Sequence, residues 1–244
     1  MHWIYLSPHL DDIAYSCGGL VWQQTQAGNT VEIWTICAGD PPEGALSTLA
    51  DEHHARWGVG PEAVAIRREE DKQACQILGA VPRHFQVPDA IYRLHPGREN
   101  GIYQSFNAVF GSLHPGEQNL VEEISQDLTS ILPENAAIVA PLTLGGHVDH
   151  RLTLAVAKKS MKPLLYYADF PYVKDHPDQL SALVPAEAEV QVYKISQPAM
   201  RCWGDAVAAH ASQLSTFWSG EADMRIDLQT YVDSQRGLRL WKTH

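Results

Sequence analysis

The sequence predicts an α/β fold built on a mostly parallel sheet with helices on both faces. Short apolar runs rich in β-branched and aromatic residues alternate with longer helical patterns along most of the 244 residues. That alternation is typical of parallel sheets. Hydrophobic residues make up 45% of the chain, enough to build a sizeable core. Neither an internal repeat nor a low-complexity tract interrupts the alternation.

The first half of the chain supplies three strands and two helices. Pro8 ends the first strand, because proline lacks the N–H that a sheet needs. Gly28-Asn29 ends the first helix, and Gly79 suits the end of the second, since both positions favour a left-handed backbone. In order, we predict a strand at 3–7, a helix at 13–27, a strand at 31–37, a helix near 61–79 and a strand at 83–87.

The second half continues the alternation. Leu120, Ile124 and Leu128 recur at helical spacing before Pro133, so they predict an amphipathic helix that stops there. Lys159 falls near the end of a later short helix, where a cation interacts favourably with the helix dipole. The predicted elements are a helix at 119–132, a strand at 136–140, a helix at 151–160, strands at 164–167 and 190–195, and a last helix at 199–217.

We expect a single domain over residues 1–244, because no composition shift marks a linker. Two long segments lack a clear period, at about 40–60 and at 94–118, and the second is rich in glycine and proline. Segments of this length in a compact domain often serve as lids or binding loops. We therefore expect both of them to shape a pocket.

Composition excludes several classes of protein. The chain has 18 Lys and Arg against 29 Asp and Glu, a formal net charge of −11, which argues against a nucleic-acid partner. Four widely spaced cysteines form no CxxC pair, so we expect free thiols in a reducing compartment. The sequence contains neither a signal-peptide pattern nor an apolar stretch of membrane-spanning length, and we expect a cytoplasmic protein without a membrane span.

Two polar clusters follow predicted strands. His9-Leu10-Asp11-Asp12 comes after the first strand, and His147-Val148-Asp149-His150 lies just beyond the strand at 136–140. Ligands of open α/β sheets bind at the carboxyl ends of the strands, so both clusters are expected at one edge. Two histidines and a carboxylate suit a catalytic metal that keeps a position open for water. Taken separately, the aspartates could merely cap a helix and the histidines could be surface residues.

The clusters together resemble the His-Pro-Asp-Asp and His-x-Asp-His signatures of the PIG-L/LmbE-like zinc deacetylases, the family of N-acetylglucosaminylphosphatidylinositol deacetylase. Arg67-x-x-Glu70 and His210-x-Ser212-Gln213 look like two weaker motifs of the same family, in the same order. The resemblance implies a Rossmann-like, three-layer LmbE-like sandwich. It also implies a hydrolase that removes the N-acetyl group from an N-acetylglucosamine-containing or related small amino-sugar substrate. Leu10 replaces the usual proline of the first signature.

Carried over position by position, the resemblance implies Zn²⁺ bound by His9, Asp12 and His150. Asp11 would take the proton of the attacking water. His147 would stabilise the oxyanion and protonate the leaving amine, with Asp149 holding the His147 ring. The same two-His-one-carboxylate set also binds Fe²⁺, so iron is possible. Related bacterial enzymes are often oligomers, which makes a homo-oligomer possible as well.

Five further positions carry weaker expectations. The resemblance places Arg67 and Asp89 against the substrate, although Arg67 could instead pair with Glu70 three residues along the helix, and Asp89 could serve only a turn. Asp169, which follows the strand at 164–167, is another candidate for substrate contact. The pair at 53–54 is expected to be a solvated helix start rather than a second metal site.

Three alternatives remain open at this point. The same site could hydrolyse an amide of a sugar–thiol conjugate or of an antibiotic intermediate, or the chain could bind metal without catalysis. A nucleotide-binding Rossmann protein is disfavoured, because no Gly-x-Gly-x-x-Gly follows a strand and no Walker A motif is present.

Overall fold

The computed structural model describes residues 1–44, 46–58, 60, 62–95 and 101–243. Seven strands form one sheet in the order β3-β2-β1-β4-β5-β7-β6. The five strands from β3 to β5 run parallel, and β7 is antiparallel to both of its neighbours. The strands are β1 His2–Ser7, β2 Thr30–Thr35, β3 Val81–His84, β4 Ala136–Pro141, β5 Leu164–Tyr167, β6 Glu189–Tyr193 and β7 Leu238–Lys242.

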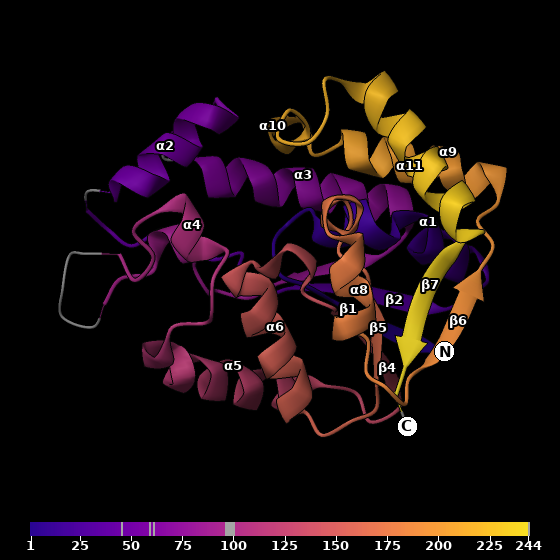
Figure 1. The fold of residues 1–244 in the computed structure, drawn as a ribbon, viewed down its shortest axis with the longest axis horizontal. Coiled ribbons are helices and arrows are strands. Elements are labelled where there is room, and N and C mark those ends of the chain that lie inside the picture. Colours follow the sequence, from indigo (N-terminus) through magenta and orange to yellow (C-terminus); the bar gives the residue numbers. More distant parts are fainter. Residues whose placement is uncertain (45, 59, 61, 96–100, 244) are drawn as a thin grey trace.

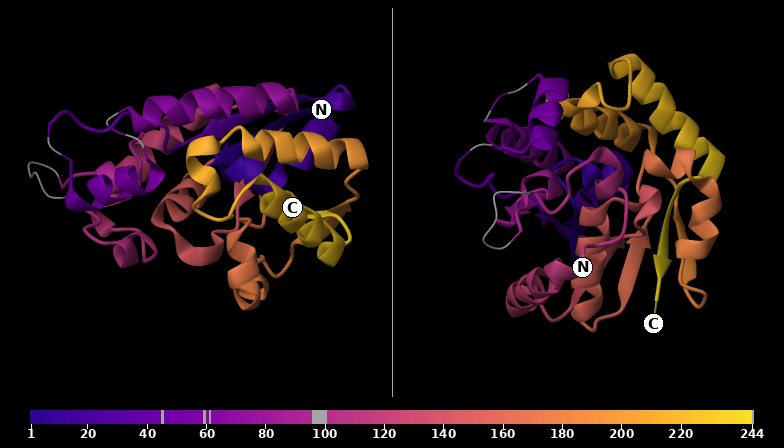
Figure 2. Two further views of the ribbon diagram at one scale, coloured as in Figure 1. Left: turned by 90° about the horizontal axis from the view of Figure 1, so that it is seen from above. Right: turned by 60° about the vertical axis from the view of Figure 1, so that its left-hand side comes forward.

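Helices cover both faces of this sheet, so the predicted fold class is confirmed (Figures 1 and 2). Helices α1, α3 and α9 pack together on one face with α11, and α5 and α6 pack together on the other. The longer helices are α1 Asp12–Gln26, α2 Thr48–Trp57, α3 Ala63–Leu78, α5 Gln118–Ile131, α6 Val148–Lys159, α9 Gln197–Ala208 and α11 Glu221–Gln235. The short ones are α4 Phe106–Val109, α7 Tyr172–Asp175, α8 Pro177–Leu183 and α10 Ala211–Leu214, with 3₁₀ turns at Ala90–Tyr92, Pro115–Glu117 and Leu144–Gly146.

Strand β1 lies at the centre of the sheet, between β2 and β4. Its residues 3–7 are all buried, which is why the sequence shows a continuous apolar run there rather than an alternation. The parallel register pairs His2 with Thr30 on one side and with Ala136 on the other. As a result β1 and β4 are neighbours, and the segments that follow them leave the sheet at the same edge.

Both segments expected to be long loops contain helix. Helix α2 lies inside 40–60 and is capped by Ser47, whose hydroxyl accepts a hydrogen bond from Ala50 N over 3.2 Å. It ends at Gly58 in the left-handed conformation. The segment 94–118 contains α4 and one 3₁₀ turn. Positions 45, 59 and 96–100 of these two segments lie outside the described residues.

The prediction for the C-terminal region was wrong in two respects. The helix expected at 199–217 breaks at His210 into α9 and α10. Helix α11 and strand β7 were not predicted, and β7 enters the sheet between β5 and β6. The third strand also starts two residues earlier than expected, because β3 is a short, half-exposed edge strand with little apolar signal.

No helix within the described ranges has both the length and the hydropathy that crossing a lipid bilayer requires.

Candidate metal centre and active site

The segment after β1 forms a tight turn that carries the side chains of His9, Asp11 and Asp12. Ser7 Oγ donates to the carbonyl of His9 over 2.5 Å, and His9 N donates to Asp12 Oδ2 over 2.7 Å. Asp11 stands at the N-cap position of α1, but its side chain makes no capping hydrogen bond. The capping role considered for Asp11 is therefore absent, and its carboxylate borders the pocket described below.

The segment after β4 turns sharply before it enters α6. The φ angle is +79° at Gly145 and +78° at Gly146, in the left-handed region where a residue with a Cβ is strained. The turn brings His147 to the N-cap of α6, and its Nδ1 accepts a hydrogen bond from Asp149 N over 3.1 Å. Helix α6 begins at Val148, three residues earlier than predicted, so His150 lies in its first turn.

The two segments bring the predicted metal ligands together. His9 Nδ1 lies 3.2 Å from Asp12 Oδ2, and His150 Nε2 lies 3.4 Å from Asp12 Oδ1. His150 Nε2 is buried and makes no hydrogen bond among the described residues. Ligand atoms of His9, His147 and His150 also lie within 4.8 Å of one another. Two imidazoles and a carboxylate around an unpartnered buried nitrogen fit a divalent metal ion.

Carboxylates hold the opposite nitrogen of each candidate histidine ligand. Asp169 Oδ1 lies 2.6 Å from His150 Nδ1, and Asp149 Oδ2 lies 3.0 Å from His9 Nε2. Such partners fix the tautomer and orientation of a metal-binding histidine. Asp169 is almost fully buried and also accepts a hydrogen bond from Leu144 N. The expectation that Asp169 contacts the substrate was therefore wrong.

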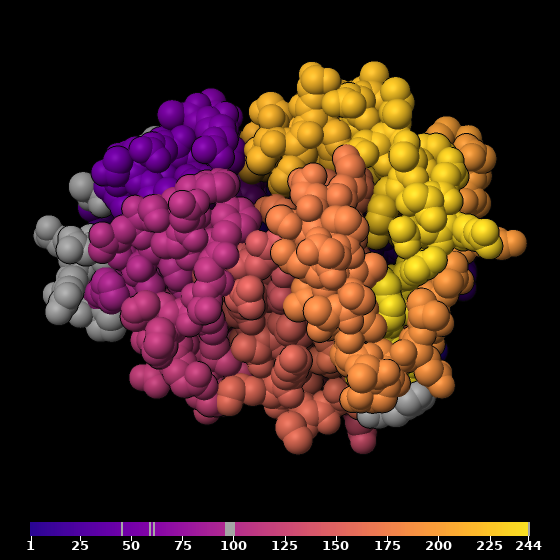
Figure 3. Space-filling model, viewed as in Figure 1, coloured from indigo at the N-terminus to yellow at the C-terminus, as the bar shows by residue number. Residues whose placement is uncertain are grey.

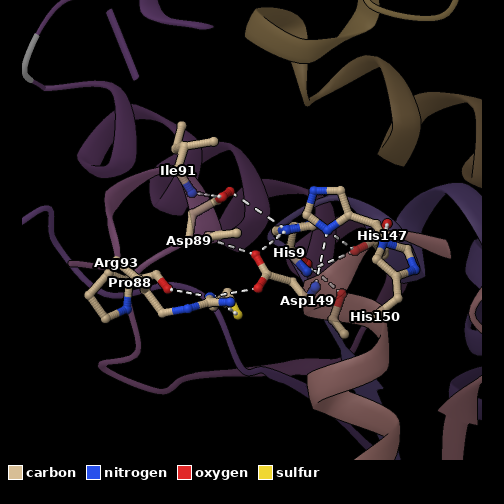
Figure 4. A network of polar contacts seen from close by, with 12 residues as sticks. His9, Pro88, Asp89, Ile91, Arg93, His147, Asp149 and His150 are labelled. Atoms are coloured by element: carbon tan, nitrogen blue, oxygen red, sulfur yellow. Dashed lines mark hydrogen bonds and ion pairs between the residues drawn. The ribbon is translucent and has the colours of Figure 1, made fainter. Parts of the chain in front are cut away.

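The family pattern implied that Asp149 holds the His147 ring, but the structure shows only its backbone N–H bonded to that ring, while its carboxylate points elsewhere. Its carboxylate is completely buried and accepts hydrogen bonds from Arg93 Nη1 over 2.6 Å and from Ala90 N over 2.9 Å, besides its contact with His9. Figure 4 shows this carboxylate between Arg93 and His9, with the His147 ring beyond. The physical reason is the helix start, because the His147 ring turns back to cap α6.

Burial and neighbouring charges set the protonation of the site. Burial raises the pKa of Asp12, but His150 and His9 outweigh it and hold that pKa below its usual range. Burial raises the pKa of Asp11, and the nearby Arg67 guanidinium only partly opposes this shift. Burial, reinforced by the charge of His9, holds the pKa of His147 well below its usual range. His147 is therefore a neutral ring at pH 7.

The Arg67 side chain lines the pocket and contacts residues of other segments. Its Nη2 is 3.6 Å from Asp11 Oδ1, its Nη1 is 4.0 Å from Asp89 Oδ2, and its guanidinium stacks 4.9 Å from the Trp57 ring centre. Glu70 instead accepts hydrogen bonds from Ser212 N and Oγ, over 2.8 and 2.7 Å. The alternative prediction, an ion pair between Arg67 and Glu70, was wrong. The two weaker sequence motifs thus contact each other.

Asp89 fixes the turn and also borders the pocket, so the turn role is present and contact with the substrate stays a prediction. Its Oδ1 accepts a hydrogen bond from Ile91 N over 3.1 Å, which fixes the turn after β3. Its Oδ2 lies 3.6 Å from His9 Nε2 and faces the pocket.

A pocket of about 980 Å³, counting its solvent-open mouth, lies above these residues. Figure 3 shows the surface hollowed where the violet α2, the magenta α4 region and the gold residues after α9 meet. Large aromatic side chains form much of its wall: Trp57, Phe106, Phe110, Phe170, Tyr172 and Phe217. The expectation of a solvated helix start at 53–54 was wrong for His54, which is buried in α2 against Tyr92.

His210 gives the fold a pH dependence of its own. The ring is fully buried, packs edge-on against Tyr15, and neither nitrogen has a hydrogen-bond partner among the described residues. Burial lowers the pKa of His210 to about 4, against about 6.5 in an unfolded chain. Between these values only the unfolded chain takes up the proton, so stability is full above about pH 6.5 and falls toward pH 4.

We therefore expect the variant His210→Phe to lose less stability in acid than the unchanged chain. Urea unfolding at pH 7 and pH 4.5, with a chelator in all samples, should give pH effects that differ by about 2 kcal/mol. Equal losses in both proteins would show that His210 does not titrate in this way.

Comparison with known proteins decides the family. The family model described as PIG-L, GlcNAc-PI de-N-acetylase, matches residues 4–161, which span both polar clusters. The chain belongs to the PIG-L family. The predicted family and fold are thereby confirmed.

Individual proteins that resemble this PIG-L family member are named as deacetylases. A 2'-N-acetylparomamine deacetylase of Niallia circulans is 27% identical over 242 residues, covering 92% of this chain and 85% of that protein. A protein of the same name from Streptomyces fradiae is 28% identical, over 69% of this chain and 57% of the other. The zinc-inhibited form of a teicoplanin deacetylase is 24% identical, covers 99% of this chain and 97% of its own, and superposes with a TM-score of 0.80.

The structure adds functional candidates that the sequence did not suggest. Arg93 and Glu117 form a buried ion pair next to Asp149. Arg93 was detectable as one cation in the run Ala90-Ile-Tyr-Arg93-Leu94, where an unpaired charge would be expensive to bury. For Glu117 we find no comparable signal.

Proposed function

We propose that this PIG-L family member uses Zn²⁺ bound by His9, Asp12 and His150 to remove an acetyl group from an amino sugar. The activity class, hydrolysis of an N-acetyl amide bond in an amino-sugar-containing molecule, is that of its family and curated relatives. The observation that carries the site is the buried, unpartnered His150 Nε2 beside Asp12. Asp169 and Asp149 already hold the other nitrogens of the two histidines.

A divalent ion held by His9, Asp12 and His150 would supply Lewis acidity for the acetyl carbonyl and for the attacking water. Asp11 takes a proton from the attacking water, a role that suits a buried carboxyl with a raised pKa. The remaining hydroxyl forms the new bond to the carbonyl carbon. Asp11 is then in its protonated form and faces the collapsing tetrahedral intermediate.

His147 stabilises the oxygen that becomes negative during this attack. Because its Nδ1 accepts the Asp149 N–H, the single hydrogen of the neutral ring sits on Nε2 and can be donated to that oxygen. Proton transfer from His147 to the amine would need an imidazolium, which burial and His9 disfavour. We therefore assign that step to Asp11: the C–N bond breaks, the nitrogen takes the Asp11 proton, and the negative oxygen re-forms the carbonyl. The free amine leaves together with acetic acid, which ionises to acetate in water.

Arg67 and Asp89 suit the hydroxyls of a sugar ring. They border the pocket above Asp11 and offer a fork of donors beside a carboxylate acceptor. The aromatic wall gives a ring flat apolar surfaces. Because both curated relatives are named for 2'-N-acetylparomamine, that compound is the first substrate to test.

The proposal is tested by amine release. Protein loaded with one equivalent of Zn²⁺ is expected to liberate primary amine from 2'-N-acetylparomamine or N-acetylglucosamine, and a chelator should abolish this release. Loading with Fe²⁺ in the absence of oxygen asks whether iron serves instead. Metal-loaded protein without amine release from either compound would contradict the proposed substrates, and protein that retains no divalent ion would contradict the proposed centre.

A further inference from the structure

A buried ion-pair network leads away from the proposed metal centre. Arg93 Nε donates a short hydrogen bond to Glu117, and Tyr103 Oη donates to the other oxygen of Glu117 over 2.5 Å. Arg93 Nη1 donates to Asp149 Oδ1 over 2.6 Å and to the carbonyl of Pro88 over 3.1 Å. The side chains of Arg93, Glu117 and Asp149 are at most 5% exposed.

The network ends on one candidate metal ligand. Asp149 Oδ1 accepts a hydrogen bond from Arg93 Nη1, while Oδ2 accepts hydrogen bonds from His9 Nε2 and Ala90 N. The other nitrogen of His9, Nδ1, faces Asp12. Figure 4 shows the line from Arg93 through the Asp149 carboxylate to the His9 ring. Two side chains thus separate Glu117 from the metal site.

The charges explain why Arg93 and Glu117 govern the position of Asp149. A carboxylate without solvent exposure stays ionised only if cations and N–H groups surround it. Arg93 is the cation on Asp149, and it has two buried carboxylates to satisfy, one on each side. Without the charge of Glu117 the guanidinium is drawn toward Asp149, and without Arg93 the Asp149 carboxylate loses the ion pair that holds it and can rotate away from His9. Either change alters the acceptor that orients His9.

We propose that Arg93 and Glu117 are positioning residues for the metal centre, which hold Asp149 so that it fixes the orientation of the His9 ring. The inference rests on the proposed function, because it takes His9 as a metal ligand. Tyr103 and Glu117 lie in the same segment as Phe106 and Phe110, which line the pocket. The ion pair between Arg93 and Glu117 therefore holds the segment that forms part of the pocket wall. Through Asp149 it also holds the proposed metal ligand His9.

Metal binding by purified apoprotein tests the proposal without any substrate. The variants are Arg93→Met and Glu117→Gln, the second of which keeps the size of the side chain and can still accept the hydrogen bond from Arg93 Nε. Zn²⁺ affinity is measured in competition with a chromophoric chelator, and Co²⁺ is added separately to record its visible absorption spectrum, which reports ligand geometry. We expect Arg93→Met to weaken Zn²⁺ binding by about 10-fold or more, and Glu117→Gln to weaken it less. Both should change the Co²⁺ spectrum.

Asp71→Asn is the matched control. It removes the charge from another carboxylate, which makes a part-buried hydrogen bond with His84 over 2.6 Å and does not touch the network. This variant is expected to lower stability while leaving the Zn²⁺ affinity and the Co²⁺ spectrum unchanged.

The outcomes separate the two hypotheses. Unchanged protein that binds neither ion would overturn the proposed function and, with it, this inference. Unchanged protein that binds Zn²⁺, together with folded variants of equal affinity and unaltered Co²⁺ spectrum, would overturn the inference alone. If Arg93→Met fails to fold, Glu117→Gln decides the matter by the same two measurements.

Discussion

Replacing Asp11 by asparagine is expected to lower kcat by about 100- to 10,000-fold, the range for removing a general base. Asparagine keeps the size of the side chain but cannot accept the proton of water. The metal should stay, because Asp11 is not among the proposed ligands and its carboxylate lies 3.6 Å from Arg67 Nη2. Steady-state kinetics on the acetylated substrate, with the metal content of the same sample measured by elemental analysis, check both halves of the expectation.

Arg67→Ala provides the contrast within the same pocket. Because Arg67 is proposed to bind the sugar rather than to move a proton, its loss should raise KM more than it lowers kcat. An Asp11→Asn enzyme with undiminished kcat would remove Asp11 from the mechanism. Loss of the metal from that variant would instead make Asp11 a ligand.

Replacing His150 by alanine is expected to remove the metal. His150 is fully buried, and its Nε2 is the nitrogen left free by Asp169. Without it only His9 and Asp12 of the proposed set remain, and two ligands hold zinc poorly. Metal content should fall from about one ion per chain to nearly none. The stabilisation that excess zinc gives the unchanged protein in thermal unfolding should vanish as well.

His54→Ala is the control for this second variant. His54 is also a buried histidine, but it contacts Tyr92 in α2 rather than the proposed centre. It should lose some stability and keep its metal. Full occupancy in His150→Ala would show that the ligand set is wrong, and His147, whose ring lies beside His9, would then be the first replacement to consider.

The sequence predicted the parts of the fold that depend on local pattern. Buried parallel strands such as β1 and β4 show continuous apolar runs, and the polar clusters that follow them must meet because the strands are neighbours. Helix α11 escaped prediction because its buried stripe is narrow. Only Met224, Leu228 and Val232 are buried, four residues apart, on an otherwise polar helix. That spacing was a usable signal.

Side-chain partners inside the site could not be predicted in the same way. The motif His-x-Asp-His places Asp149 between two histidines, yet its carboxylate bonds to His9, some 140 residues away. The choice depends on where Arg93 and the turn at Ala90 pack, which no local pattern encodes. The role of Asp169 depends likewise on a contact between β5 and α6 that exists only in the assembled sheet.

The place of β7 in the sheet has a consequence for how the protein is made. Strand β5 pairs with β7 along one of its edges, and β6 lies at the edge of the sheet, paired with β7. During synthesis the apolar edge of Leu164–Tyr167 therefore stays unpaired until residues 238–242 have emerged. An exposed strand edge is a template for pairing with other chains. Nascent protein halted before β7 should therefore be prone to aggregation, and chaperones that shield such edges would raise the yield of folded enzyme.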